Sequence, residues 1–88
     1  MKELFERLES TTDIVVRRIE CAGFSSEDYY TIEHTESYMD GLEVFTNENN
    51  HFFISSLANT LLEYNNNEYI LKSSNGSIVS FLFIKEEE

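Results

Sequence analysis

Hydrophobic residues recur at three- and four-residue steps over residues 2–22, the spacing that places them along one side of a helix. Gly23 follows this segment and suits a helix cap. Ser10 and Asp13 have the spacing of a capping box, so a short helix followed by a second one is the alternative. We favour one helix, bent at this cluster, whose apolar side carries Leu4, Phe5, Leu8, Thr12, Val15, Val16, Ile19 and Ala22.

Beyond residue 28 the hydrophobic residues alternate with polar ones, which is typical of strands. Alternation and turn residues predict strands at 29–38, 42–47 and 51–55, joined as an antiparallel meander. Helix is the alternative for 51–55, because hydrophobic residues from Phe53 onward also follow a four-residue step. Two adjacent Phe and a β-branched Ile favour the strand.

The first hairpin of this meander has two competing registers. Met39-Asp40-Gly41 suits a three-residue loop with Gly41 in the left-handed region, which would pair Tyr38 with Leu42. A two-residue turn at Asp40-Gly41 would mix the two faces of the strands. We favour the three-residue loop, because one face then carries Tyr30, Ile32, Tyr38, Leu42 and Val44.

A second helix is expected after the meander, capped by Ser55 or Ser56 and continuing to about Tyr64. Asn65-Asn66-Asn67 would end it. Its inward side would carry Leu57, Ala58, Leu61 and Leu62.

The C-terminal segment has the clearest pattern. Residues 68–74 and 77–84 flank Asn75-Gly76, a strong signal for a β-hairpin with a type I′ turn. That turn would pair Ile70 with Phe81 and Tyr69 with Leu82. Both faces of 78–84 are mostly apolar, so we expect this strand to be central or covered on both sides.

These elements predict an α+β fold: N-terminal helix, three-stranded antiparallel meander, second helix and C-terminal β-hairpin. A chain of 88 residues is long enough for one core, so residues 1–88 are expected to form a single acidic domain. Residues 86–88 would be a flexible tail.

The charge of the chain is strongly segregated. Its net charge is −11, and residues 19–71 contain ten carboxylates but no Lys or Arg. Direct binding to nucleic acid or to an anionic membrane is disfavoured, because both require basic residues. The sequence predicts a basic protein partner, such as a nuclease, another nucleic-acid-binding protein or a toxin. The lone Cys21 and the acidic N-terminus indicate a cytoplasmic protein.

The residue pattern favours no catalytic site, cofactor or metal site. No nucleophile has a base partner, and the three glycines are isolated. His34 lies near Glu33 and Glu36, but Glu33 would face the opposite side of the strand. An exposed strand residue is the simpler interpretation of His34.

The candidate partner-binding residues are acids and an aromatic residue of the meander, of its turns and of the polar connection before it. Alternate residues of a strand lie roughly 6.6 to 6.8 Å apart, a spacing comparable to that of successive phosphates. Carboxylates on one face could therefore imitate a nucleic-acid strand, and tyrosine is favoured at interfaces. The candidates are Glu27, Asp28, Tyr29, Glu33, Glu36, Asp40, Glu43 and Glu48.

The order of acidic helix, meander and helix, with an Asn-rich turn in residues 41–56, resembles small phage anti-CRISPR proteins. The resemblance covers about residues 1–64, and the C-terminal hairpin departs from it. It implies a non-enzymatic inhibitor in the cytoplasm of a host cell, whose acids occupy the DNA-binding site of an RNA-guided nuclease. An immunity protein or antitoxin against a basic toxin, and an acidic interaction subunit, are the alternatives. An exposed edge of the meander could also pair with a second copy to form a homodimer.

Overall fold

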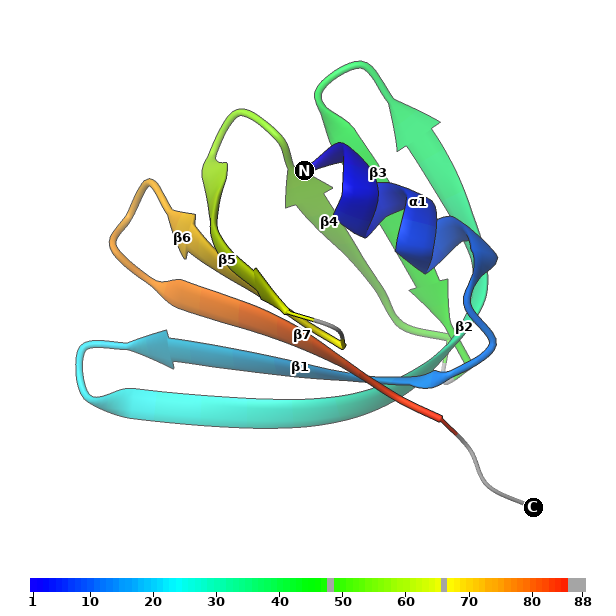
Figure 1. Ribbon diagram of the computed structural model, residues 1–88, viewed down its shortest axis with the longest axis horizontal. Coiled ribbons are helices and arrows are strands. Elements are labelled where there is room, and N and C mark those ends of the chain that lie inside the picture. Colours follow the sequence, from blue (N-terminus) through cyan, green and yellow to red (C-terminus); the bar gives the residue numbers. More distant parts are fainter. Residues whose placement is uncertain (48, 66, 86–88) are drawn as a thin grey trace.

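The computed structural model describes residues 1–47, 49–65 and 67–85. These residues form one helix and seven strands, and the strands pair into a single antiparallel sheet (Figure 1). Across the sheet the strand order is β4-β3-β2-β1-β7-β6-β5, so β1 and β7 join two meanders. In chain order the elements are α1 (Lys2–Ser10), β1 (Ile14–Cys21), β2 (Phe24–Tyr38), β3 (Gly41–Thr46), β4 (His51–Ser55), β5 (Asn59–Asn65), β6 (Glu68–Ser73) and β7 (Ile78–Ile84).

The predicted α+β fold is therefore wrong. The described part of the chain is a seven-stranded antiparallel sheet with one short N-terminal helix. The segments expected as strands at 42–47 and 51–55 are β3 and β4, which confirms strand over helix for 51–55. The strand expected at 29–38 is the second part of the longer β2. The tail expected at 86–88 lies outside the described residues.

The N-terminal helix ends at Ser10, and the second half of its predicted span is strand β1. Thr11 is already extended, with φ −78° and ψ 145°, and its hydroxyl accepts a hydrogen bond from the Asp13 amide at 3.0 Å. The β-branched run that begins at Ile14 then favours a strand. Since β1 pairs along its length with β2 and β7, both neighbours satisfy its backbone. The helical spacing of its hydrophobic residues is a coincidence.

The end predicted for that helix is a tight turn. Ala22 and Gly23 have φ of 51° and 85° and join β1 to β2, with Cys21 paired to Phe24. Two positive φ values are what a two-residue type I′ hairpin requires. Gly23 thus serves a hairpin and not a helix cap.

The second predicted helix is also a strand, β5. The Ser55 side chain does act as a cap, accepting hydrogen bonds from the amides of Leu57 and Ala58, but it closes a single turn. The chain then extends and pairs with β6, which satisfies its backbone through the sheet. Leu57, expected to point inward, is 83% exposed.

The β2–β3 hairpin has neither of the registers considered for it. Its loop is Met39-Asp40, Tyr38 pairs with Gly41, and Gly41 is not in the left-handed region. A β-bulge between Ile32 and His34 shifts the register by one residue. The bulge compensates for the shorter loop, so Tyr30, Ile32, Leu42 and Val44 still share a face, whereas Tyr38 lies on the other.

The C-terminal hairpin forms as expected, but its register differs by one residue. Tyr69 pairs with Phe81, and Ile70 pairs with Ser80. Within this loop only Gly76 has a positive φ, and its amide donates to the Ser73 carbonyl. The Ser73 amide donates to the Ser77 carbonyl, so the loop between them has three residues. This register puts both aromatic rings in the core. The strand β7 is central, between β1 and β6, as predicted.

The sheet curls around a single core, and α1 packs against its concave face, called here the inner face (Figure 1). Arg7 of α1 lies over the Phe83 ring at 4.6 Å and donates to the Asn67 side chain, so the helix sits toward the end of β7. The core joins two leucines of the helix to inner-face residues of five strands: Leu4, Leu8, Val15, Leu42, Val44, Ile54, Tyr69, Leu71, Phe81 and Phe83. The convex side of the sheet is the outer face.

Candidate functional site

The candidate site lies on the outer face of β2, β3 and β4. Because the bulge at Ile32 and His34 resets the alternation of β2, Glu36 points outward and pairs in register with Glu43 of β3. Like charges directly opposite each other in a sheet destabilise it. We call Glu36 and Glu43 the acidic pair.

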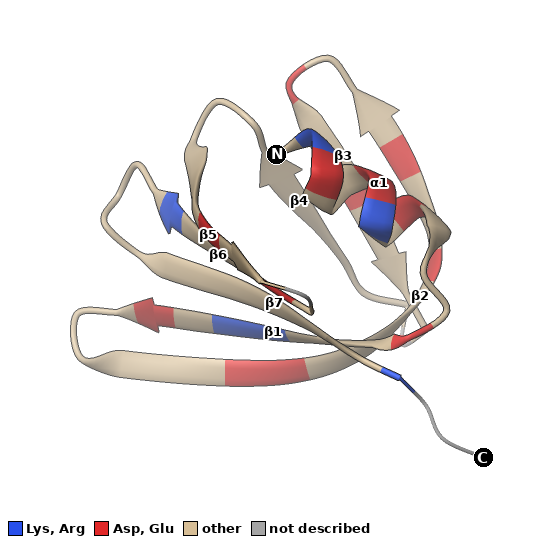
Figure 2. Cartoon of the chain, viewed as in Figure 1, with Lys and Arg blue, Asp and Glu red and all other residues tan. Residues whose placement is uncertain are grey.

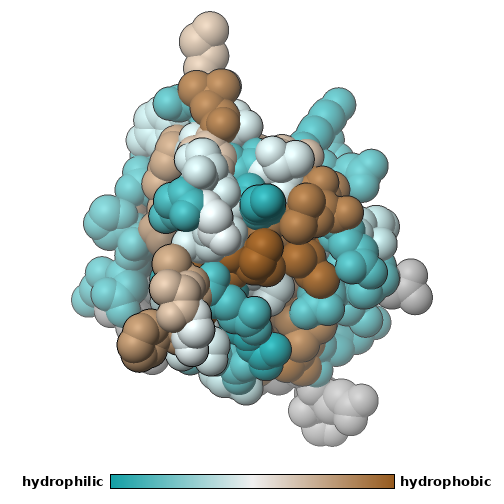
Figure 3. Space-filling model, turned by 90° about the vertical axis from the view of Figure 1, so that its left-hand side faces the viewer, coloured by the Kyte–Doolittle hydropathy of each residue, from teal (hydrophilic) through white to brown (hydrophobic). Residues whose placement is uncertain are grey.

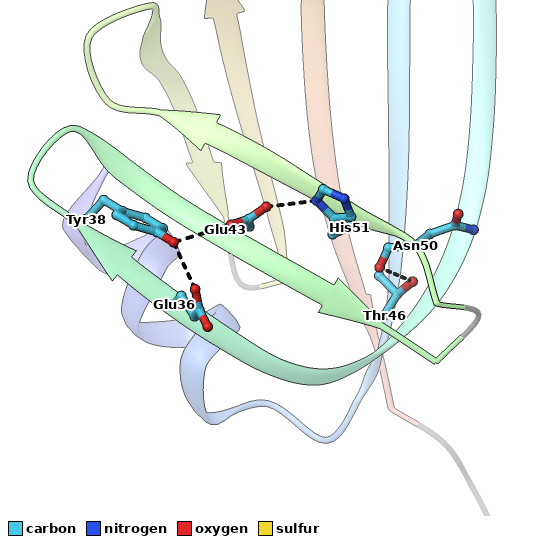
Figure 4. Close-up of polar contacts among 6 residues, drawn as sticks. All are labelled: Glu36, Tyr38, Glu43, Thr46, Asn50 and His51. Atoms are coloured by element: carbon cyan, nitrogen blue, oxygen red, sulfur yellow. Dashed lines mark hydrogen bonds and ion pairs between the residues drawn. The ribbon is translucent and has the colours of Figure 1, made fainter.

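Two side chains hold the acidic pair in place (Figure 4). The Tyr38 hydroxyl lies 2.8 Å from Glu36 Oε2, to which it donates, and 3.5 Å from Glu43 Oε1. On the other side, His51 Nδ1 lies 2.8 Å from Glu43 Oε2. One phenol therefore bridges the two carboxylates, and an imidazole from β4 fixes the second.

The hydrogen bond to Glu36 and the negative charge of that residue raise the pKa of Tyr38. Deprotonation would add a third negative charge beside two carboxylates. The phenol consequently stays protonated, and a donor, as the pH rises into the alkaline range.

Aromatic rings extend the site along the three strands. His34 stacks on Phe45 with ring centroids 4.2 Å apart and an interplanar angle of 8°, and Phe45 lies 5.6 Å from the His51 ring. Tyr38 contacts Phe53 edge-on at 6.1 Å. These aromatic contacts restrict the rotamers of the rings, so the acidic pair is surrounded by ordered and largely exposed aromatic side chains.

The turn between β3 and β4 supports this arrangement (Figure 4). Both the amide and the hydroxyl of Thr46 donate to the Asn50 carbonyl, at 2.8 and 3.1 Å. Asn49, with φ 60°, supplies the left-handed residue that the turn needs. The turn fixes the register of β4 and thereby the position of His51 beside Glu43.

Basic residues lie elsewhere. Figure 2 shows acidic but no basic segments on β3 and the adjoining half of β2, whereas β1, β6 and α1 carry basic residues. The described ion pairs of Lys and Arg are Lys2–Glu6, Arg7–Asp13 and Arg18–Glu27. Glu36 has no described ion pair, and the ion pair of Glu43 depends on protonation of His51.

The other predicted candidates on β2 do not join the acidic pair. Glu27 accepts hydrogen bonds from Arg18 and Tyr29, which lower its pKa, Arg18 contributing most. Asp28 occupies the next position along the strand and so faces the inner side. Glu36 lies nine positions after Glu27 along the strand, a distance of up to about 30 Å at 3.3 Å per residue. Glu27 and Asp28, both predicted as partner-binding residues, therefore lie apart from the acidic pair.

Three further candidates lie around the hairpins and the bulge. Glu33 falls within the bulge, between the paired Ile32 and His34. Asp40 is in the β2–β3 loop, where its carbonyl accepts a hydrogen bond from the Ser56 amide. Glu48 lies outside the described residues. The structure thus brings together Glu36 and Glu43, with Asp40 at the end of the same hairpin.

Sequence reasoning missed the residues that organise the acidic pair. The sequence predicts His51 only as the start of a strand, and it gives no reason to single out Phe45. The predicted hairpin of β3 and β4 does place His51 near Phe45 in principle, because the length of the turn determines which residues on its two sides pair. The prediction for Tyr38 puts it on the wrong face, because the bulge leaves no signal in the hydrophobic pattern.

No group of three or more His, Cys, Asp or Glu side chains is placed to hold a metal ion, as far as the structure describes the chain. Among the described residues no helix has the length and apolarity needed to cross a membrane.

Replacing Glu36 by Gln is expected to lower the pKa of Tyr38 toward the ordinary value of a phenol. The amide carries no charge and accepts a weaker hydrogen bond. Titration of the tyrosine ring signals by NMR would measure this pKa. Glu33→Gln is the control and should leave the pKa of Tyr38 unchanged. If Glu36→Gln also left the pKa of Tyr38 at its value in the unmodified protein, the hydrogen bond between Tyr38 and Glu36 would be contradicted.

Comparisons with protein-family models, with curated proteins and with solved structures found no match for this chain. Its function is therefore inferred from the geometry of the outer face.

Proposed function

We propose that this protein is a binding protein, without catalysis, whose acidic pair engages a basic surface on another protein. The observation that carries the proposal is the placement of Glu36 directly across from Glu43 without a described Lys or Arg paired to either. A like-charge pair costs stability in the free domain. Arg or Lys side chains of a partner would turn that cost into attraction.

The surroundings of the acidic pair support a protein partner. Tyr38 and Phe53 supply aromatic contact area next to the carboxylates, and tyrosine and phenylalanine are enriched at interfaces. Arg binds a carboxylate through two parallel hydrogen bonds. A partner that normally binds phosphates with Arg is the natural complement, and occupancy by this protein would exclude its nucleic acid. Inhibition of a nuclease or CRISPR effector is the form of this function that we favour.

The proposal is tested in two steps: proteins that bind DNA-cellulose are first collected from a lysate of the native host, and the tagged protein is then used as bait to capture a partner from among them. We expect a captured protein to be released by added duplex DNA and by moderate salt. Retention of that protein in both washes would rule out competition for a nucleic-acid site.

The double variant Glu36→Lys/Glu43→Lys is expected to weaken binding to the captured protein at least about tenfold, because repulsion replaces attraction. Glu9→Lys/Glu63→Lys is the matched control, since it changes the net charge equally at two exposed positions away from the acidic pair. Binding constants at two salt concentrations provide the measurement. Equal losses in the two variants would show that only net charge matters and would move the binding site elsewhere.

A further inference from the structure

A groove opens on the inner face of the sheet, on the side opposite the acidic pair. It has a volume of about 120 Å³ and a lining drawn from β1, β4, β5, β6 and β7. On the face of the molecule in Figure 3, hydrophobic side chains lie at the centre with hydrophilic ones around them. The apolar part of the lining includes Ile19, Phe52, Ile54, Leu71, Val79 and Phe81.

Arg17 is the charged residue of this lining. Its guanidinium lies 4.2 Å from the Phe52 ring centroid and 5.4 Å from that of Tyr30, so two aromatic rings hold it. One of its nitrogens donates to the Tyr30 hydroxyl at 3.3 Å, and its Nε is buried without a hydrogen-bond partner among the described residues. No described carboxylate forms an ion pair with it, although Asp28 is its cross-strand neighbour.

A charge in an apolar groove is unfavourable unless it is paired and hydrogen-bonded. Cation–π contacts offset part of this cost and the bond to Tyr30 uses one guanidinium donor, but the buried Nε–H still has no described acceptor. The fork of an arginine matches a carboxylate in shape, and such hydrogen bonds are about twice as strong as neutral ones. The feature that the groove lacks is therefore an anion at Arg17.

We propose that the groove binds a small amphipathic carboxylate. The carboxylate pairs with Arg17, and the apolar body of the ligand lies against Phe52, Val79 and Phe81. An apolar cavity of about 150 Å³ accommodates benzene, so the body is limited to about one ring or a few carbons. This inference does not rest on the proposed partner binding, because Arg17 and the acidic pair lie on opposite faces of the sheet, although Phe53 borders both sites.

Benzoate is the probe, with benzyl alcohol, benzylammonium and inorganic phosphate as comparison ligands. NMR titration of the whole protein is expected to show benzoate binding about ten- to a hundredfold more tightly than benzyl alcohol. The shifts should be centred on Phe52, Phe81 and the Arg17 Nε–H signal. Arg17→Met keeps the apolar stem and should abolish the preference for benzoate over benzyl alcohol.

Tyr30→Phe is the second variant, because it removes a hydrogen bond to Arg17 but leaves the charge in the groove. Benzoate should bind it at least as tightly as the unmodified protein. The proposal is overturned by equal affinity for benzoate and benzyl alcohol, by absence of binding, or by shifts centred on Arg18 or Lys72. Equal affinity for inorganic phosphate would likewise overturn it, since the apolar lining would then contribute nothing. The comparison of ligands on the unmodified protein decides the matter even if Arg17→Met does not fold.

Discussion

Replacing Leu8 by Ala is expected to lower the free energy of unfolding by about 2–5 kcal/mol. Leu8 is 1% exposed and anchors α1 to the inner face of the sheet. A domain of this size has roughly 4–13 kcal/mol of stability in total, so the loss would be a large fraction. At about 4–8 °C per kcal/mol, the melting temperature should fall by about eight degrees or more.

The same substitution at Leu57 is the matched control. Leu57 is 83% exposed in the β4–β5 turn, so Leu57→Ala should change the free energy of unfolding by no more than about 0.5 kcal/mol. Urea unfolding of the two variants measures both values. A large loss for Leu57→Ala would instead favour the buried helix that the hydrophobic pattern predicts at 56–64.

Replacing Gly41 by Ala is expected to cost about 3 kcal/mol or more, at the upper end of the usual cost of overpacking. A Cβ atom here would collide with the Ile54 carbonyl oxygen and lie 2.5 Å from the Phe53 ring. The ring can move, but the carbonyl belongs to β4, which pairs with β3 at this point. Relief would therefore require the two strands to separate.

Gly76 provides the control for this prediction. It has φ 91°, and a Cβ atom added to it would have no described atom within 4 Å, so Gly76→Ala should cost only the conformational strain, about 1–2 kcal/mol. Asn tolerates the left-handed region, so Gly76→Asn should be milder than Gly76→Ala, whereas Gly41→Asn should be as harmful as Gly41→Ala. Thermal unfolding of the four variants tests the pattern. If Gly41→Asn were milder than Gly41→Ala, the result would instead support the left-handed conformation that the sequence predicts for Gly41.

The acidic pair and the Arg17 groove depend on opposite faces of the same sheet. The outer positions of β2 and β3 carry the acidic pair, and the inner positions of β1 and β4 carry Arg17 and Phe52. Because alternate residues of a strand face opposite sides, a charge on one face does not contact the other. The variant Glu36→Lys/Glu43→Lys should therefore retain benzoate binding, which separates the two proposals experimentally.

Five of the seven described strands could be predicted, β2 only in its second part, because their signals are local. The alternation in β3, the paired Phe residues of β4 and the Asn75-Gly76 turn each act within a few residues. The two helical predictions that are wrong have a different cause. Ile14–Cys21 and Asn59–Asn65 have hydrophobic spacings compatible with either period, and each becomes a strand because a neighbouring strand satisfies its backbone.

The candidate site was predictable only in part. A cross-strand pair of acids in the β2–β3 hairpin was predictable in principle, but its members depended on the register set by the two-residue Met39-Asp40 loop, and the face that they occupy depended on the bulge. Arg17 carries a signal that the helical interpretation hides, since Val15, Arg17 and Ile19 alternate as inner-face residues of a strand. With a period of two, this pattern places a cation among apolar residues.

The sequence by itself determined the charge, the absence of Lys and Arg from residues 19–71, and the positions of most turns, because these depend on composition and on neighbouring residues. Only the tertiary structure decided which segments are strands, where the registers fall and which acids meet. Those outcomes depend on hydrogen bonds and packing between segments far apart in the chain, as where β1 pairs with β7. A shift of one residue moves every side chain to the other face, and local sequence does not encode that choice strongly enough.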